Sequence, residues 1–291
     1  MYKRQFLPLV EDAYRKGYFP LDLIPELGEM GVLGGNLDFP DSPGMSNVAY
    51  GLVAQEMERG DSGLRSFGSV QGGLVMYPIW RYGSEEQKAK WLPQLHAGRK
   101  IGAFGLTEPD HGSDPGGMET KATKVSDGYV LNGAKMWITN STIADVSVVW
   151  AKLDGEIHGF LVEKDTPGYS APETRRKHSL RASVTGEIVL QDVHIGDDAI
   201  LPGAKGLGGP LSCLNQARYT IAWGAIGAAM ACYDEVRNYG LERTQFDRPI
   251  GSFQLYQAKL VHMLSEITKG QLLNLQLGRL KDQGKATPDH V

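Results

Sequence analysis

Two short stretches of the chain carry side chains suited to binding a flat, phosphate-bearing cofactor. In the first, an apolar segment from Ile101 to Leu106 runs into Thr107, Glu108 and Pro109. A turn rich in glycine, serine and aspartate follows at 110–117. Such a turn leaves hydroxyl groups and backbone N–H groups at the lip of a loop. This stretch therefore predicts a site for a polyanion.

The second stretch places an aromatic ring beside a hydroxyl group. After a hairpin-type turn at 126–128, the residues from Tyr129 to Ile138 predict a strand that ends at Trp137 and Thr139. Trp137 can stack on a flat ring while Thr139 bonds to its edge. Taken alone, Trp137 is equally well explained as a core aromatic, and the glycines as turn formers. The two stretches together, about thirty residues apart, favour a site.

The strings GLTEPDHGSD at 105–114 and KMWITN at 135–140 resemble the flavin-binding signature of the acyl-CoA dehydrogenases. The similarity continues through 71–72, 82–87, 92–93 and 243–246, and covers essentially the whole chain. Within the family, the chain is most similar to the glutaryl-CoA dehydrogenases, through ERGDSGLRS at 58–66, SLRAS at 179–183 and LNQARY at 214–219.

The resemblance implies that FAD is the cofactor. It implies that Thr107 lies near the flavin ring and that Ser113 lies near the pyrophosphate and the coenzyme A arm. Arg243 and Gln254 match residues that reach the flavin of a neighbouring subunit, although Asp247 stands where the family usually has glycine. The implied FAD-binding residues are Phe104, Gly105, Leu106, Thr107, Glu108, Pro109, Gly112, Ser113, Trp137, Ile138, Thr139, Arg243 and Gln254.

Arg65 is the charge that bears on the substrate. By resemblance, Arg65 holds the distal carboxylate of glutaryl-CoA, because a guanidinium group can bind a carboxylate through two hydrogen bonds. The alternative is a surface arginine, solvated or paired with Glu58. The implied substrate-binding residues are Arg65, Ser66, Ser113, Leu211, Leu214, Asn215 and Arg218.

The implied reaction is α,β-dehydrogenation of an acyl-CoA, in which a carboxylate takes the α proton and FAD accepts a hydride. For glutaryl-CoA, decarboxylation to crotonyl-CoA and CO₂ would follow, as in lysine and tryptophan degradation. Neither family position for the base is filled: Ala217 precedes Arg218, and no Tyr-Glu-Gly-Thr-like string occurs before Val291. No catalytic residue is assigned, and we expect a fragment with little turnover.

Periodicity predicts an α+β fold in three domains that position these residues. Residues 1–99 favour helices, including Ser62 to Arg81 and a helix capped at Ser84. Residues 100–205 favour a β-barrel-like or orthogonal-sheet domain, with further strands at 145–151, 158–163 and 186–195. Residues 206–291 favour a hinge-like linker at 206–210 and an incomplete bundle with helices at 211–240 and 253–282.

The amino-acid composition argues against several other classes of function. A net charge of −4 without long charged runs argues against nucleic-acid or anionic-membrane binding, and no apolar run approaches the ~20 residues of a membrane span. Cys213 and Cys232 form no CxxC pair, which indicates buried thiols in a reducing compartment. The seven histidines show no metal-ligand spacing. The basic run at 175–178 fits a solvated loop, or a site for a phosphate-rich ligand such as coenzyme A.

The resemblance further implies an electron-transfer flavoprotein as electron acceptor, a homotetramer, and a bacterial cytoplasm, or the mitochondrial matrix in a eukaryote. Three alternatives remain open: a dehydrogenase for another short or branched acyl-CoA, a flavin-dependent acyl-CoA oxidase, and a non-catalytic truncated subunit.

Overall fold

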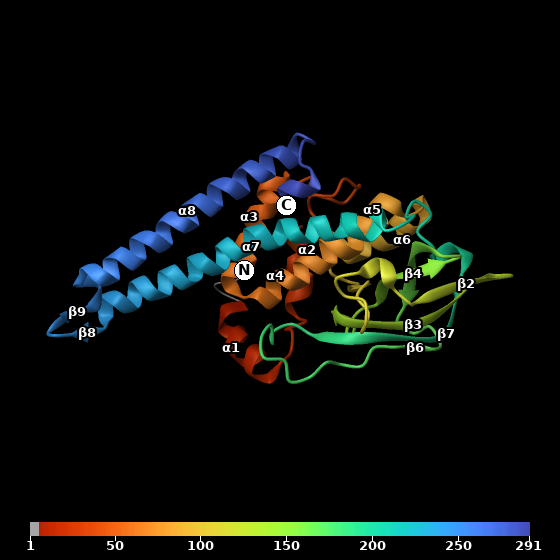
Figure 1. The fold of residues 1–291 in the computed structure, drawn as a ribbon, viewed down its shortest axis with the longest axis horizontal. Coiled ribbons are helices and arrows are strands. Elements are labelled where there is room, and N and C mark those ends of the chain that lie inside the picture. Colours follow the sequence, from red (N-terminus) through yellow and green to blue (C-terminus); the bar gives the residue numbers. More distant parts are fainter. Residues whose placement is uncertain (1–5) are drawn as a thin grey trace.

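The computed structural model describes residues 6–291, and its elements fall into three consecutive stretches (Figure 1). Helices come first, a seven-stranded sheet follows, and two long helices end the described chain. This order confirms the predicted α+β class with helical regions on both sides of a β-domain. The first helices are α1 (Leu7–Lys16), α2 (Leu23–Glu29), α3 (Asn47–Gly60), α4 (Ser62–Ser69), α5 (Tyr77–Tyr82) and α6 (Glu85–His96).

Local capping explains where two of these helices begin. The Ser46 hydroxyl accepts a hydrogen bond from the Ala49 backbone N–H at the start of α3. At the start of α6, Ser84 and Gln87 form the reciprocal capping box that the sequence predicts. The Gln87 amide also donates to the carbonyl oxygens of Asp198 and Ile200, so this cap ties α6 to the β-domain.

The predicted helix from Ser62 to Arg81 is continuous but not uniform. A π-helical segment, Val70–Met76, separates α4 from α5. A Cβ atom on Gly72 would lie 2.5 Å from the Tyr50 hydroxyl oxygen, and one on Gly73 would lie 3.3 Å from Gln216 Cβ. The two glycines therefore allow neighbouring elements to approach this segment closely.

In the sheet, the eight-residue strand β4 (Val146–Leu153) pairs with three other strands. β4 pairs in parallel with β1 and β2 and in antiparallel with β5, while β3 links β2 to β7. The β2–β3 hairpin closes at Val125 and Gly128, as the turn signal predicts. The strands are β1 (Gly102–Gly105), β2 (Lys121–Val125), β3 (Gly128–Thr139), β4 (Val146–Leu153), β5 (Glu156–Glu163), β6 (Tyr169–Ser170) and β7 (Thr185–Gly196).

A hydrophobic core shared by the helices and the sheet fixes β1, an end strand of the sheet's pairing order. Trp150 of β4 is fully buried and meets Phe104 edge-to-face, with ring centroids 6.1 Å apart. Val75 and Leu95 from the helical side belong to the same cluster. Burying each of these large side chains contributes about 1.5–3 kcal/mol. The strand that leads into the first chemical stretch is therefore held rigidly.

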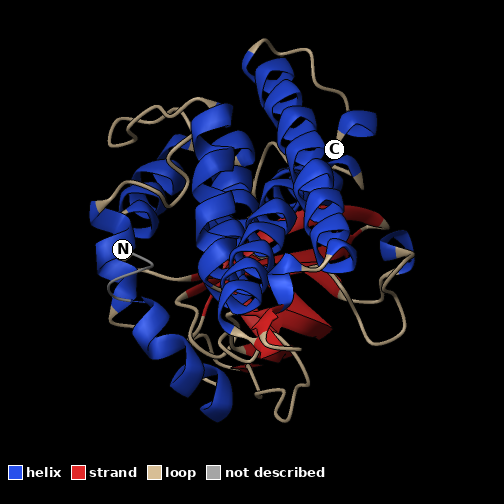
Figure 2. Cartoon of the chain, turned by 90° about the vertical axis from the view of Figure 1, so that its left-hand side faces the viewer, coloured by secondary structure: helices blue, strands red, loops and turns tan. Residues whose placement is uncertain are grey.

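The two last helices form an arm that extends beyond the rest of the molecule in Figure 1, and the tip of this arm points toward the viewer in Figure 2. They are α7 (Gly208–Glu242) and α8 (Gln254–Asp282), joined at the tip by β8 (Thr244–Gln245) and β9 (Arg248–Pro249). The 35 residues of α7 span about 52 Å. The predicted linker at 206–210 is wrong in part, because α7 begins at Gly208 and Gly209 packs against Trp150.

The predictions about membrane spans and about the two thiols can be compared with the fold. Within residues 6–291, no helix combines the length and the apolar character needed to cross a membrane. Cys213 is buried, as predicted, but Cys232 is exposed on α7, so the prediction of two buried thiols is wrong for Cys232. The exposure follows from the arm, because the outer part of α7 leaves the body of the protein.

Candidate functional site

The two stretches that predict the cofactor site, 101–117 and 129–139, lie side by side. The Met136 backbone N–H donates a 2.8 Å hydrogen bond to the Thr107 carbonyl oxygen. This bond sets the residues after β1 against the end of β3. Thr107 and Trp137, thirty residues apart in the chain, therefore belong to one surface.

A buried ion pair reinforces that contact. Lys135 Nζ is 2.7 Å from Glu108 Oε1 and 3.2 Å from the Leu106 carbonyl oxygen. The same carboxylate accepts backbone N–H bonds from Glu119 at 2.6 Å and Thr120 at 3.0 Å. Glu108 thus ties the two ends of the turn to β3, and its side chain is occupied within the protein.

The electrostatics of the pair follow from its environment. Burial raises the pKa of Glu108, but the Glu119 N–H group and the Lys135 ammonium outweigh this effect and lower it to about 2. Burial lowers the pKa of Lys135 to about 8, against the opposing effect of the Glu108 carboxylate. Both groups are charged at neutral pH.

Trp137 points out of the sheet. Its side chain is 58% exposed, which rules out the alternative of a core aromatic. A register shift between Lys135 and Ile138 marks a bulge in β3, and Trp137 has a left-handed φ of 63°. Ile138 is buried and Thr139 is half-buried. The bulge thus presents an uncovered indole ring next to the Thr107 segment, as a stacking surface requires.

The turn after Pro109 is open and lies near the start of α7. Gly112 and Ser113 are exposed, and a Cβ atom on Gly112 would meet nothing within 4 Å. A Cβ atom on Gly116 would lie 3.8 Å from Leu207, just before α7. The turn is therefore close to the helix that carries the predicted substrate-binding residues Leu211, Leu214, Asn215 and Arg218.

Those α7 residues differ in their surroundings. Leu214 is half-buried against the shared core, and Leu211 is 36% exposed. Arg218 Nη1 donates to Asn215 Oδ1 at 3.0 Å, so both side chains lie on one face of the first turns of α7.

The alternative interpretation of Arg65 is wrong about its exposure, but the predicted pairing with Glu58 is confirmed. Arg65 is only 7% exposed, and its Nε atom donates to the Glu58 carboxylate. A Cβ atom on Gly224 would lie 3.2 Å from Arg65 Nε, so this glycine lets the pair pack against α7. Within the described chain, no hydrogen bond involves Arg65 Nη1 or Nη2. Ser66 is half-buried beside it.

Arg243 and Gln254 do not join this surface within one chain. Both are exposed at the tip of the arm, where α7 ends and α8 begins. Figure 1 shows the tip on the opposite side of the molecule from the sheet. The structure thus brings the two chemical stretches and the start of α7 together, and keeps the tip of the arm apart from them.

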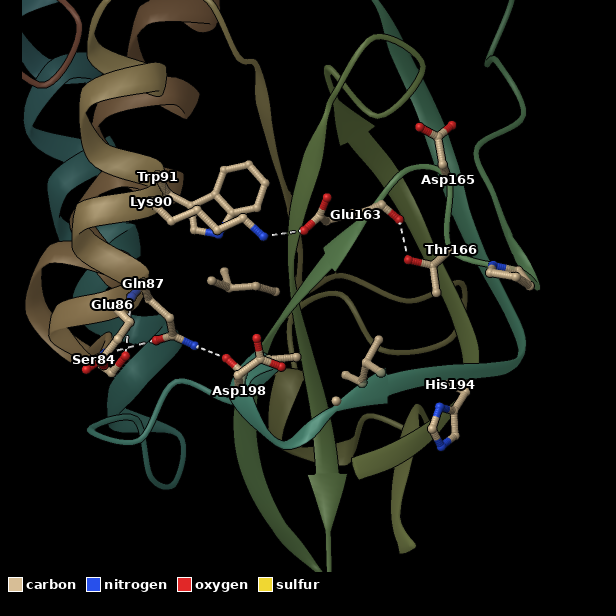
Figure 3. A pocket seen from close by; sticks show the side chains of 15 residues that line it. Ser84, Glu86, Gln87, Lys90, Trp91, Glu163, Asp165, Thr166, His194 and Asp198 are labelled. Atoms are coloured by element: carbon tan, nitrogen blue, oxygen red, sulfur yellow. Dashed lines mark hydrogen bonds and ion pairs between the residues drawn. The ribbon is translucent and has the colours of Figure 1, made fainter. Parts of the chain in front are cut away.

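Two cavities of similar size adjoin the β-domain. One, of about 730 Å³, includes Glu108 and Pro109 in its wall. The other, of about 740 Å³, lies between α6 and the ends of β5 and β7 (Figure 3). Lys90 and Glu163 form a 2.6 Å ion pair across it. None of the predicted cofactor- or substrate-binding residues lines the second cavity.

Lys135 positions the candidate site through Glu108, and the sequence reasoning did not assign it this role. Its signal was present, because a charged residue inside a mostly apolar strand requires a buried partner. The partner itself, Glu108, is 27 residues away and follows only from the fold.

Comparisons with known proteins cover all three stretches. Residues 1–99 match "Acyl-CoA dehydrogenase, N-terminal domain", 103–193 match "Acyl-CoA dehydrogenase, middle domain" and 204–291 match "Acyl-CoA dehydrogenase, C-terminal domain". The chain is 36% identical to the probable acyl-CoA dehydrogenase YngJ of Bacillus subtilis, over 97% of this chain and 77% of that protein.

Two solved structures show the same similarity. One is a glutaryl-CoA dehydrogenase from Mycobacterium smegmatis in complex with FADH2, with 50% identity, a TM-score of 0.98, and coverage of 99% of this chain and 75% of the other. The second is butyryl-CoA dehydrogenase from Megasphaera elsdenii, with 33% identity, a TM-score of 0.93, and coverage of 99% and 78%.

Proposed function

Because this chain belongs to the acyl-CoA dehydrogenase family, we propose that the surface joining Thr107 to Trp137 binds FAD for the oxidation of an acyl-CoA. The observation that carries this proposal is the 2.8 Å bond between Met136 and Thr107, which places a hydroxyl-bearing segment next to an exposed indole. Bound FAD supplies the hydride acceptor.

The residues of this surface have distinct roles in the proposal. Trp137 stacks on the isoalloxazine ring, while Thr107 and Thr139 bond to its edge. The open turn at Gly112 and Ser113 leaves N–H and hydroxyl groups for the pyrophosphate and the coenzyme A arm. The Glu108–Lys135 pair holds this turn in place and does not itself contact the ligand.

The proposed substrate is glutaryl-CoA, which is oxidised and then loses its distal carboxylate as CO₂ to give crotonyl-CoA. Arg65 supports this assignment, because Glu58 engages only its Nε atom and the terminal nitrogens have no hydrogen bond within the described chain. From Asn215, Gly224 beside Arg65 lies nine residues along α7, about 14 Å. An acyl chain can therefore extend from the start of α7 toward a guanidinium group.

A plain short-chain acyl-CoA is the second candidate. Glu58 already neutralises Arg65, so the pair can also be a purely structural element that contacts an uncharged chain. The 33% identity to a butyryl-CoA dehydrogenase is consistent with this candidate.

The first turns of α7 do not supply the base that accepts the α proton of the acyl-CoA. Some relatives carry a carboxylate just before the arginine that matches Arg218, and this chain has Ala217 there. Alanine cannot accept a proton, so we propose that the α proton goes to a carboxylate outside the first turns of α7.

The arm fits a homo-oligomer in which one copy completes the FAD site of another. Arg243 and Gln254 are exposed at the tip of the arm, and Arg243 lies 25–32 residues, about 38–48 Å, along α7 from the proposed substrate-binding residues at 211–218. If a second copy received this tip, Arg243 and Gln254 would reach the flavin of that copy. We further propose a homotetramer, an electron-transfer flavoprotein as acceptor, and a cytoplasmic or mitochondrial-matrix compartment.

Titration with FAD tests the proposed function. The purified full chain should take up FAD with quenching of flavin fluorescence, and the bound flavin should change its absorbance when an acyl-CoA is added. A protein that takes up no FAD, or whose flavin ignores every acyl-CoA, would contradict the proposal.

A further inference from the structure

A histidine packs inside the turn that presents Gly112 and Ser113 to solvent. His111 lies near the start of the turn at 110–117, and Gly117 lies at its end. A Cβ atom on Gly117 would lie 2.6 Å from His111 Nδ1 and 2.8 Å from His111 Cε1. No side chain fits at position 117 while the imidazole stays in place. The ring therefore lies directly against the Gly117 backbone and joins the two limbs of the turn.

Hydrogen bonds fix the base of this turn but leave its tip free. The Glu108 N–H donates to the His111 carbonyl oxygen, and the Gly117 N–H donates to the Asp114 carbonyl oxygen, both at 3.2 Å. Gly112 and Ser113, both exposed, lie between these two bonded segments. The contact of His111 with Gly117 thus joins the residue directly before the open tip to the limb that follows it.

Open space lies beside both limbs of the turn. The cavity of about 730 Å³ has residues 108–111 and 117–121 in its wall, so the turn relies on contacts between its own limbs. The ion pair of His111 with Glu119 gives little support, because the two atoms are 3.9 Å apart and the Glu119 side chain is 81% exposed. The imidazole itself is only 25% exposed. Packing of the ring on Gly117 is therefore the stronger link.

Resting on the proposed function, we propose that His111 is a positioning residue for the pyrophosphate of FAD. Its imidazole holds the tip in the conformation that presents the N–H and hydroxyl groups of Gly112 and Ser113, and does not itself touch the ligand. A Cβ atom on Gly112 would meet nothing within 4 Å, so no neighbouring side chain orders this glycine. A tip that is ordered beforehand loses less backbone entropy when the ligand binds.

A double-variant cycle tests the contact. His111→Ala removes the ring, and Gly117→Ala adds a methyl group that displaces it; the Asp114 carboxylate, 3.0 Å from the new Cβ, is exposed and can move away. Each variant of the full chain should raise the Kd for FAD on the order of tenfold. The double variant should show about the same loss as either single one, because no ring remains to be displaced. A multiplied loss, on the order of a hundredfold, would overturn the proposal.

Two further variants distinguish packing from direct binding. His111→Phe keeps a flat ring but has no ring nitrogen, and should leave the Kd within about threefold of the unaltered protein. A loss as large as that of His111→Ala would overturn the positioning role, because the imidazole would then bond to the ligand. His194→Ala is the matched control: this exposed histidine of β7 also pairs with a carboxylate, Asp127, at 3.1 Å. It should change the Kd by less than about twofold.

A spectroscopic readout separates this role from a general loss of structure. At saturating FAD, the absorbance spectrum of the bound flavin should be the same in His111→Ala as in the unaltered protein, because the ring site at Trp137 is intact. A changed spectrum, or an unchanged Kd in His111→Ala, would overturn the inference alone. Failure of the proposed function would show separately, as unaltered protein that takes up no FAD.

Discussion

Glu108 and Lys135 form a 2.7 Å ion pair in the interior of the β-domain, with exposures of 5% and 0%. The pair joins the turn after β1 to the bulged end of β3, and these are the two segments that carry Thr107 and Trp137. A buried pair of this kind contributes little net stability when intact, but leaves an uncompensated charge when one partner is removed.

We expect Glu108→Gln to lower the free energy of unfolding by about 3–5 kcal/mol at pH 7. The double variant Glu108→Gln/Lys135→Met should recover much of this loss, because it buries no unpaired charge. Urea unfolding followed by tryptophan fluorescence measures both. If the double variant is as unstable as the single one, the damage comes from the lost backbone bonds to Glu119 and Thr120 and not from the orphaned ammonium.

The same pair predicts a loss of stability in acid. The pKa of Glu108 is about 2 in the folded protein and near its ordinary 4.5 in the unfolded chain. Relative to the protonated carboxyl group, the ionised Glu108 side chain therefore adds about 3 kcal/mol to the free energy of unfolding above pH 4.5, and this difference is lost as the pH falls toward 2. Unfolding free energies measured from pH 6 to pH 3 should decline less steeply in Glu108→Gln. Identical slopes in the two proteins would show that Glu108 does not titrate in this way.

Trp137→Ala should separate binding from stability. Because the ring is exposed, its removal should change the unfolding free energy by no more than about 0.5 kcal/mol. Loss of a stacking partner for the flavin should raise the Kd for FAD about 5- to 150-fold, from 1–3 kcal/mol of stacking. Fluorescence titration provides the Kd, and Trp137→Phe is the matched control that retains a ring. Unchanged affinity in the alanine variant would remove Trp137 from the proposed site.

Substitution of Arg65 tests the substrate. Arg65→Met should weaken glutaryl-CoA much more than butyryl-CoA, because only the former has a distal carboxylate. Since the change orphans the buried Glu58, the comparison is made in Arg65→Met/Glu58→Gln, with Glu58→Gln alone as control. Spectral titration of the bound flavin gives both affinities. Equal losses for the two thioesters would favour the plain short-chain candidate.

Mixed oligomers test the arm. In Trp137→Ala and Arg243→Ala homo-oligomers, every FAD site carries a defect. If the tip of one chain completes the site of another, a dimer with one chain of each kind has one intact site, and tight FAD binding returns at half occupancy. Co-expression with two affinity tags isolates this species for titration. No recovery would indicate that Arg243 acts within its own chain or not at all.

Local signals predicted much of the fold, and long-range pairings explain what they missed. The capping box at Ser84 and the hairpin before β3 depend on residues a few positions apart, so the sequence predicts both. The exposure of Cys232 depends instead on how far α7 projects from the body, and the partner of Lys135 depends on a contact across 27 residues. No local period encodes either.

In the candidate site, too, some features follow from local sequence patterns and others depend on contacts between distant residues. Regular strand alternation would place Trp137 on the same face as Lys135, which is fully buried, so the exposure of the Trp137 ring comes from the bulge between Lys135 and Ile138 and not from the strand pattern. The basic run at 175–178 is a loop with Arg175 and Arg176 exposed, as one of its two interpretations predicted, and Arg181 and the end of α1 complete a concave pocket beside it. Its shape depends on hydrogen bonds that join residues more than 160 positions apart.

The π-helical segment Val70–Met76 also fixes an angle between the two ends of its helix. A π turn holds one residue more than an α turn, and each residue of an α-helix advances the chain by 100°. Were the same seven residues wound as an ordinary α-helix, everything before them would be rotated by about that angle relative to α5. Arg65 would then no longer face α7. The π-helical segment therefore sets the orientation of the Arg65 guanidinium group toward α7.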